Sequence, residues 1–193
     1  MGNATGIARK AGALFALISG LGIGVAQASC PAPDKLKATS FERHFIQEKH
    51  VSGLNKPLRS EGQMSVSEKE IVWHMSKPFD VKTTMSSTGI TQSVDGGEPV
   101  SVGPESSDIA GGIAKSMASM MRGEWSTLEK IFVVDASPVP AEGDWVVRLT
   151  PHDERLGALI GKITIHGCTD VNQVNIERPD GDGETIRFDP VKL

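Results

Sequence analysis

Apolar and polar residues alternate with a period of two along most of the chain after residue 39. In the segment SFERHFIQEKH, Phe41, Arg43, Phe45 and Gln47 share one face. The same alternation, typical of strands, recurs further along. The segments concerned are 58–67, 70–78, 80–87, 89–94, 130–137, 145–151, 161–167, 171–179 and 184–190. Most of the intervals between them are too short for a helix. The sequence therefore predicts an antiparallel sheet, rolled into a barrel or packed as a sandwich.

One segment, 106–125, departs from this pattern and has the period of a helix. Its apolar residues recur at every fourth position and have one apolar neighbour. They are Ile109, Ile113, Met117 and Met121, flanked by Met120. Gly111 and Gly112 lower the helix propensity by roughly 1–2 kcal/mol relative to alanine. The helix therefore depends on the surface that it packs against, and its position between two groups of strands predicts a lid.

Residues 1–28 have the three parts of a secretory signal peptide. Two basic residues precede an apolar run at 11–26, and the sequence AQA that follows has the small-x-small form of a cleavage site. The apolar run is short for a membrane span. We expect export, with cleavage before Ser29 and a single domain over residues 29–193.

Charge limits the partners that this chain can take. The chain has 20 basic and 24 acidic residues, a net charge of −4. Two of the basic residues and none of the acids lie in the predicted signal peptide, so the exported part carries −6. A negative chain without a basic cluster argues against nucleic-acid binding. It also argues against docking on an anionic membrane by charge alone.

Cys30 and Cys168 are the two cysteines of the chain. In an exported protein an even number of cysteines favours a disulfide, which here would tie the mature N-terminus to a late strand. The alternative is lipidation of Cys30, because it follows the predicted signal peptide closely. Gln27 fits that alternative poorly, since lipoprotein signals usually have an apolar residue there. The sequence favours the disulfide.

No arrangement of residues indicates a catalytic or metal centre. The histidines are scattered, two cysteines cannot form a zinc cluster, and no serine-hydrolase motif occurs. His152 and Asp153 are adjacent, but they follow Pro151 in a polar segment typical of a solvated turn. We therefore predict no enzyme, no metal and no cofactor. The methionines of the helix suit a surface that accepts varied apolar partners, although core packing is the simpler interpretation of the stripe alone.

The first half of the chain resembles the LolA-like periplasmic lipoprotein carriers. It shares with them a Ser-Phe-x-x-x-Phe-x-Gln pattern in the first strand, a glycine at Gly62, and a Trp-x-x-x-x-Pro pattern from Trp73 to Pro78. The resemblance extends over roughly residues 38–190. It implies a mainly β fold, an incomplete, half-open antiparallel β-barrel with a helical lid.

The resemblance also implies an apolar interior that binds a ligand. One face of the strands and one face of the lid would line it. The ligand-binding residues implied are Phe41, Phe45, Met64, Trp73, Met75, Ile109, Ile113, Met117, Met120, Met121, Trp145, Val147, Leu149 and Ile163. Arg43 and Lys49 share a face with Phe41 and Phe45. We expect them at the rims, with their charged ends in water.

The function implied by the resemblance is transport. A monomeric carrier in the periplasm would shelter the acyl chains of lipoproteins or related lipids. It would take this cargo from an inner-membrane donor protein to an outer-membrane acceptor protein. Two alternatives remain open. One is an outer-membrane receptor of the same fold, anchored through a lipidated Cys30. The other is an enzyme that acts on a lipid or polyene substrate through His152 or Asp153.

The sequence departs from the family at one functional position. Family members typically carry Arg-Pro in the hairpin before the tryptophan strand, and that arginine helps to hold the lid. This chain has SEKE at residues 67–70 instead. The arginine contact is therefore absent or made from another place.

Overall fold

The computed structural model describes most of the chain after residue 29. The described residues are 2, 30–36, 40–86, 88–102, 107–137 and 144–190, with their side chains except those of 107–114 and 137. Their elements are η1 (Pro33–Lys35), β1 (Phe41–His50), β2 (Leu58–Val66), β3 (Glu70–Lys77), β4 (Val81–Ser86), β5 (Gly89–Val94), β6 (Val100–Ser101), α1 (Ser107–Arg122), α2 (Trp125–Leu128), β7 (Phe132–Ser137), β8 (Trp145–Pro151), α3 (Glu154–Leu159), β9 (Lys162–Gly167), β10 (Val171–Glu177) and β11 (Gly183–Phe188).

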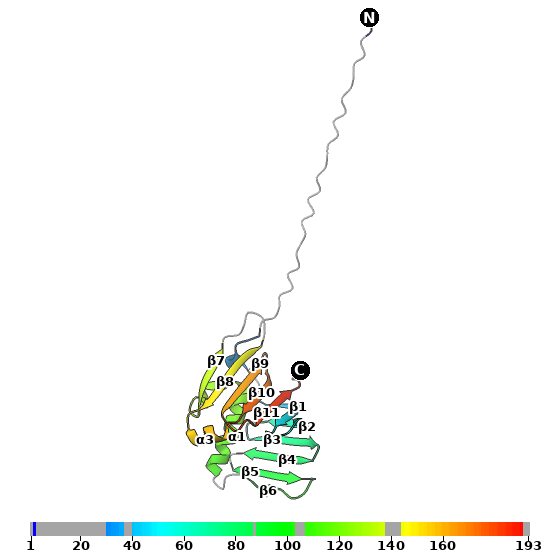
Figure 1. Ribbon diagram of the computed structural model, residues 1–193, viewed down its shortest axis with the longest axis vertical. Coiled ribbons are helices and arrows are strands. Elements are labelled where there is room, and N and C mark those ends of the chain that lie inside the picture. The colour runs from blue at the N-terminus through cyan, green and yellow to red at the C-terminus, as the bar shows by residue number, and fades with distance from the viewer. Residues whose placement is uncertain are drawn as a thin grey trace.

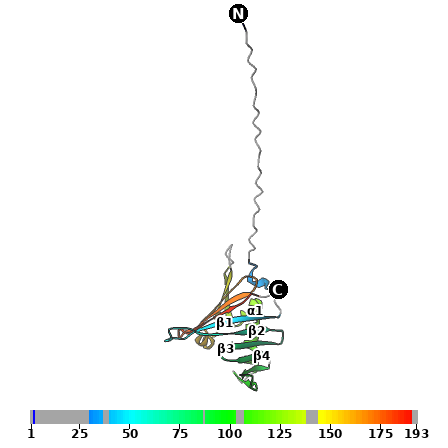
Figure 2. The same cartoon turned by 90° about the vertical axis from the view of Figure 1, so that its right-hand side faces the viewer.

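The strands form one antiparallel sheet of 11 strands in the order β6-β5-β4-β3-β2-β1-β11-β10-β9-β8-β7. Two meanders, β1–β6 and β7–β11, meet where β1 pairs with β11, with Phe45 opposite Phe188. The short β6 and the strand β7 are the two ends of the order, so the sheet curls around α1 without closing (Figures 1 and 2). The predicted class, mainly β with an unclosed antiparallel sheet, is confirmed.

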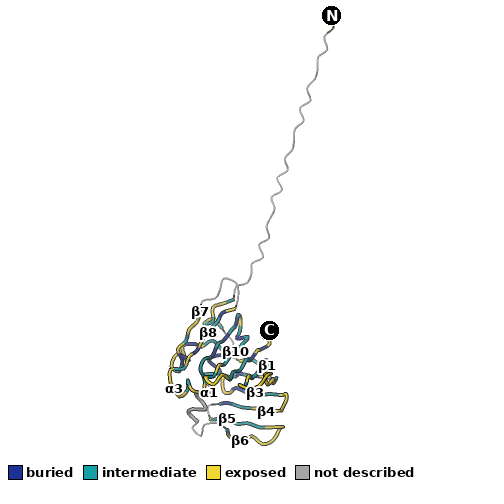
Figure 3. The backbone as a smooth tube through the Cα atoms, in the orientation of Figure 1, coloured by how far each residue is buried: buried dark blue, intermediate teal, exposed yellow. Residues whose placement is uncertain are grey.

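One face of the sheet, which we call the inner face, carries the core. In β8, Trp145, Val147 and Leu149 are buried, whereas Val146 is intermediate and Arg148 and Thr150 are exposed. Buried residues also alternate with less buried ones in the second half of β2 and along β9, and Figure 3 marks the buried residues in dark blue. The period-two pattern of the sequence is therefore the division between this core and the solvent.

Two glycines allow a close approach that a side chain would prevent. A Cβ atom on Gly62 would lie 1.9 Å from the carbonyl oxygen of His74. The register between β2 and β3 shifts at this point, between Glu61 and Gly62, and brings the two backbones together. A Cβ on Gly167 would lie 2.4 Å from the ring of Trp145. Gly62 therefore allows the backbones of β2 and β3 to approach closely. Gly167 allows the Trp145 ring to lie against the end of β9.

The predicted strands agree with the observed ones to within a few residues at their ends, and 180–183 forms the predicted β10–β11 hairpin. The helix predicted at 106–125 is observed as α1 followed by the separate turn of α2. Helix α3 was not predicted. The predicted signal peptide lies outside the described residues except for Gly2, so it remains a prediction.

Candidate functional site

An aromatic cluster lies at the centre of the inner face. The ring centroids of Phe45 and Trp73 are 4.0 Å apart, and Trp73 meets Phe188 edge-on at 6.4 Å. Pairing produces this cluster, because Phe45 lies opposite Gly62 on one side and opposite Phe188 on the other. The missing side chain of Gly62 lets the backbone of β3 approach β2 beside Phe45.

The inner face is less well covered on the side of β3, β4 and β5. Trp73 and Met75 on β3 are only partly buried, as are Val81 on β4 and Ile90 on β5. Val94, the last residue of β5, is exposed. This part of the inner face therefore presents apolar side chains that the fold does not fully cover.

Helix α1 covers one end of these strands. It contacts β3, β4 and β5, and in Figure 1 it lies by their left-hand ends while the strands continue to the right. Ala118, Met120 and Met121 are buried, Met117 packs against the core, and Lys115 is exposed. The described half of α1 is therefore amphipathic, with its methionines directed into the molecule.

The C-terminal end of α1 is defined by its backbone. The N–H of Glu124 donates to the carbonyl of Ser119 at 2.9 Å, and the N–H of Gly123 donates to that of Met120 at 3.3 Å. Gly123 has φ +71°, which a residue with a side chain rarely adopts. These bonds form a Schellman motif. They turn the chain sharply into α2, so the direction of α1 is set by its own sequence.

An arginine at the end of α1 ties it to the sheet. Nη2 of Arg122 donates to the carbonyl oxygen of Ser67 at 2.9 Å, and Nη1 of Arg122 lies 3.7 Å from a carboxylate oxygen of Glu124. Ser67 begins the β2–β3 turn, where the family resemblance implies an arginine and this chain has none. In this chain the arginine comes from the helix and the acceptor from the hairpin. The role of Arg122 could not be predicted, because nothing in the sequence shows what the end of α1 faces.

Helix α2 covers the other half of the inner face. Trp125 packs edge-on against Trp145, with ring centroids 6.0 Å apart, and Leu128 is 0% exposed. Nε1 of Trp145 donates to the carbonyl oxygen of Cys168 at 2.7 Å. This half of the sheet is a closed hydrophobic core.

The predicted ligand-binding residues divide between these two environments. Those that are buried are Phe45, Met64, Met120, Met121, Trp145, Val147, Leu149 and Ile163. Those that are partly buried are Phe41, Trp73, Met75 and Met117. The side chains of Ile109 and Ile113 lie outside the described part of the chain. A ligand can reach the second group with less rearrangement than the first.

The prediction that Arg43 lies at a rim with its charged end in water is wrong. Arg43 is 5% exposed, its Nε donates to the carbonyl of Asp189 at 2.6 Å and its Nη1 to that of Val171. Its guanidinium also lies 5.3 Å from the ring centroid of Phe188. Burial lowers the pKa of Arg43, while the carboxylates of Asp170 and Asp189 act in the opposite direction. The two carbonyls compensate the buried charge, and Arg43 fastens β1 to the C-terminal strands.

The two residues of the enzyme alternative have structural roles. The side chain of Asp153 accepts hydrogen bonds from the backbone N–H groups of Arg155 and Leu156 and caps α3. The hydrogen bond from the Arg155 side chain, followed by that from the Leu156 backbone, holds the pKa of Asp153 below its usual value. His152 is exposed, with Nε2 3.1 Å from the carbonyl oxygen of Glu129. Asp153, which was predicted to lie in a solvated turn, is therefore the N-cap residue that marks the start of α3.

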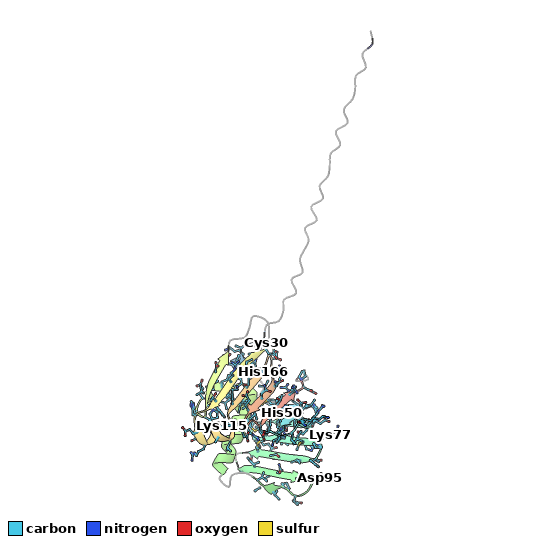
Figure 4. All side chains as sticks on the ribbon, viewed as in Figure 1. Cys30, His50, Lys77, Asp95, Lys115 and His166 are labelled. Atoms are coloured by element: carbon cyan, nitrogen blue, oxygen red, sulfur yellow. A yellow bond between two sulfur atoms is a disulfide. The ribbon has the colours of Figure 1, made fainter. Side chains whose placement is uncertain are left out.

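Cys30 and Cys168 form a disulfide, 138 residues apart in sequence. It joins the segment before η1 to the end of β9, where Figure 4 places Cys30. The Cys30 sulfur in this structure is bonded to Cys168 and is not free to carry a lipid. Among the residues that the structure describes, no helix has the length and apolar character needed to cross a membrane.

The family model described as outer membrane lipoprotein carrier protein LolA-like matches residues 34–187. The chain belongs to this LolA-like family. No curated protein sequence matches it significantly.

Solved structures with a similar course of the chain include a LolA superfamily protein from Nitrosomonas europaea, with 9% identity, a TM-score of 0.44, and 84% of this chain and 90% of that chain covered. Another is a DUF1329 family protein from Desulfovibrio piger, with 8% identity, a TM-score of 0.44, and 83% of this chain and 87% of that chain covered.

Proposed function

We propose that this protein is a periplasmic carrier that shelters the acyl chains of lipoproteins or related lipids. The observation that carries the proposal is the incomplete cover of the inner face. Apolar side chains around Trp73 and Met75 are only partly buried. The element over their strands is a helix with buried methionines, tied to a hairpin through Arg122. Membership of a family described as lipoprotein carriers supports the same function.

The proposed mechanism is an exchange of apolar contacts. Without cargo, Met117, Met120 and Met121 of α1 occupy the space over the inner face. With cargo, an acyl chain takes their place along Trp73 and Met75, and α1 moves outward. Methionine suits this exchange because its flexible, polarizable side chain packs against surfaces of different shape. The β7–β9 half, closed by α2, stays unchanged and holds the fold together.

Because apolar binding is strong, loading must also cost the carrier free energy, so that the cargo can be released. Burying one CH₂ group contributes about 0.8 kcal/mol, so a fully covered chain of sixteen carbons would contribute about 12 kcal/mol. Three such chains would contribute about 36 kcal/mol, beyond the practical limit of about 18–21 kcal/mol for non-covalent binding. Displacing α1 from the inner face offsets part of this gain. The cost of that displacement makes release to an acceptor possible.

The route of the cargo follows from the predicted export. We propose that the protein acts as a monomer in the periplasm. An inner-membrane donor protein would load it, and an outer-membrane acceptor protein would receive the cargo. Native mass spectrometry of protein purified gently from the periplasm would identify the acyl compound that it carries.

A photoreactive fatty acid tests the proposed binding surface. The probe carries a diazirine at the end of its acyl chain, and peptide mapping after irradiation locates the label. We expect labelling of β3, around Trp73 and Met75, and of the methionine segment of α1. Met75→Glu should lower the labelling, because a carboxylate disfavours the apolar chain. The matched control is Val133→Glu on β7, where Val133 is exposed.

Circular dichroism verifies that both variants are folded. Label spread evenly over the surface, or equal labelling of the Met75 variant and the unmodified protein, would contradict the proposal. Label confined to β8 and β9 would show that cargo enters the half that we assign to the fixed core.

A further inference from the structure

The large apolar side chains that the described residues expose all lie at one edge of the sheet. They are Leu54, Leu58, Phe79, Val94, Val100, Val133 and Leu159. Each stands in a turn, or next to one, at the edge where β1, β3, β5, β8 and β10 end and their neighbours begin. We call this edge the apolar rim. Figure 4 shows Lys77 and Asp95 on it, at the ends of β3 and β5 away from Lys115 of α1.

The part of the apolar rim between β1 and β4 is also basic. Lys49, Lys56, Arg59, Lys77 and Lys82 lie there, against the three acids Glu48, Glu61 and Asp80. All three acids are already paired, Glu48 with Nη1 of Arg187 at 2.9 Å. Glu61 lies 2.7 Å from Nζ of Lys77 and 4.0 Å from Nη2 of Arg59, and Asp80 lies 2.8 Å from Nε2 of His74. This segment therefore carries excess positive charge on a protein whose net charge is negative.

A pocket of about 380 Å³ opens beside the exposed apolar tips. Arg59, Ser60, Glu61, Lys77 and Pro78 line it, so two cations and one carboxylate face the same space. Phe79, directly after Pro78, is 68% exposed, and Leu58, directly before Arg59, is 55% exposed. Arg59 and Lys77, which can bind a phosphate group, thus lie next to Leu58 and Phe79. These two apolar side chains are more than half exposed.

We infer that the apolar rim between β1 and β4 docks on a bilayer surface that contains anionic phospholipids. Phe79 and Leu58 enter the boundary between headgroups and acyl chains, and Arg59 and Lys77 bind the phosphate groups of the lipids. A protein partner fits less well, because the core of a protein interface is depleted in lysine and its apolar area is continuous. Single apolar tips flanked by lysine and arginine are the pattern of interfacial lipid contact.

This inference goes beyond the carrier function, since it concerns the surface on which the protein rests and not the cargo. It gives the protein a way to reach a membrane directly. Cargo-free protein can test it, so its failure would leave the proposed carrier function intact, and the reverse also holds.

Vesicle flotation tests the docking surface. The protein is recovered from cells after export, and its intact mass verifies that the apolar run at 11–26 is absent. It is mixed with vesicles of phosphatidylglycerol and phosphatidylethanolamine, or with vesicles of phosphatidylcholine alone. We expect flotation with the anionic vesicles only, weakened by salt but not by inorganic phosphate at equal ionic strength.

Two variants locate the contact. Phe79→Ser should lower the partition constant about tenfold, because an aromatic side chain no longer enters the interface. Lys77→Ala should lower it about fivefold, the effect of one cation near an anionic surface. Their matched controls lie on the rim outside the segment between β1 and β4: Val133→Ser, another exposed apolar residue, and Lys162→Ala, another lysine paired with a glutamate. Both controls should float like the unmodified protein.

Three results would overturn the inference. They are no flotation with anionic vesicles, equal flotation with neutral vesicles, and equal loss in the Phe79 and Lys77 variants and in their controls. Displacement by inorganic phosphate at constant ionic strength would likewise show that the pocket binds the free ion rather than a membrane.

Discussion

The two halves of the inner face differ in how they are covered. In the half with α2, Trp125 packs on Trp145, and the inward side chains of β8 and β9 are almost completely buried. Under α1, the side chains of β3, β4 and β5 are partly buried, and the strands extend beyond the helix (Figure 1). Both halves consist of the same kind of strand. The difference therefore lies in the covering helix, and it separates a region that maintains the fold from one that can exchange its contacts.

The largest effect should come from the packed half. Trp145 is 0% exposed, contacts Trp125 and donates to a backbone carbonyl. Trp145→Ala should lower the free energy of unfolding by about 3–5 kcal/mol. Trp73→Ala, in the half under α1, should cost less, because part of its ring already meets solvent. Urea denaturation followed by far-UV circular dichroism measures both. Equal losses would contradict the distinction between the halves.

Removal of the disulfide should have the next largest effect. Replacing Cys30 and Cys168 together by serine frees the N-terminal segment from the end of β9 and enlarges the unfolded ensemble. We expect a loss of about 2–4 kcal/mol in the free energy of unfolding. Acyl binding at saturating ligand should be retained, since neither cysteine belongs to β3 or α1. An unchanged unfolding midpoint would show that the disulfide contributes nothing to stability.

Arg43 joins the two halves, so its replacement tests their connection. Arg43→Met keeps much of the side-chain volume but leaves the carbonyls of Val171 and Asp189 without their donor. The expected loss is about 1–3 kcal/mol. The control is Arg59→Met, because the Arg59 side chain is 60% exposed. This substitution should change the free energy of unfolding by less than about 1 kcal/mol. Equal losses of stability in the two variants would contradict the buried position of Arg43.

The smallest effect on stability should come from the contact that ties α1 to the hairpin. Arg122→Gln removes the hydrogen bond to Ser67 and should cost about 0.5–1.5 kcal/mol. Hydrogen exchange should become faster in α1 and stay unchanged in β8. Lys115→Gln, at an exposed position of the same helix, is the control. Equal acceleration in α1 and β8 would mean that the helix is not a separate unit.

The strands could be predicted because each buries one face, and burial of one face imposes a period of two on the sequence. Helix α1 could be predicted for the same reason, from apolar residues four positions apart. These local patterns were enough for the fold class and for most residues of the inner face. They could not divide that face into a packed half and a partly covered half, because α2 is four residues long and has no period of its own.

Contacts between distant segments are what the sequence could not show. Arg43 stands in a strand beside phenylalanines, where a charged group normally reaches water. It is buried because the carbonyls of two segments more than 120 positions away converge on it. Arg122 likewise contacts Ser67, which lies 55 residues earlier in the sequence. Helix α3 was missed for a local reason, since Asp153 was taken for part of a solvated turn and is a helix cap.

A removable crosslink between α1 and the β2–β3 hairpin tests the central claim most directly. Lys69→Cys and Arg122→Cys place thiols on the two sides, and among the described residues no other cysteine is free. A short bismaleimide joins them, and the same double variant blocked with N-ethylmaleimide is the control. We predict that the blocked protein binds a fluorescent fatty acid and that the crosslinked protein does not. Equal binding by both would contradict a helix that must move to admit an acyl chain.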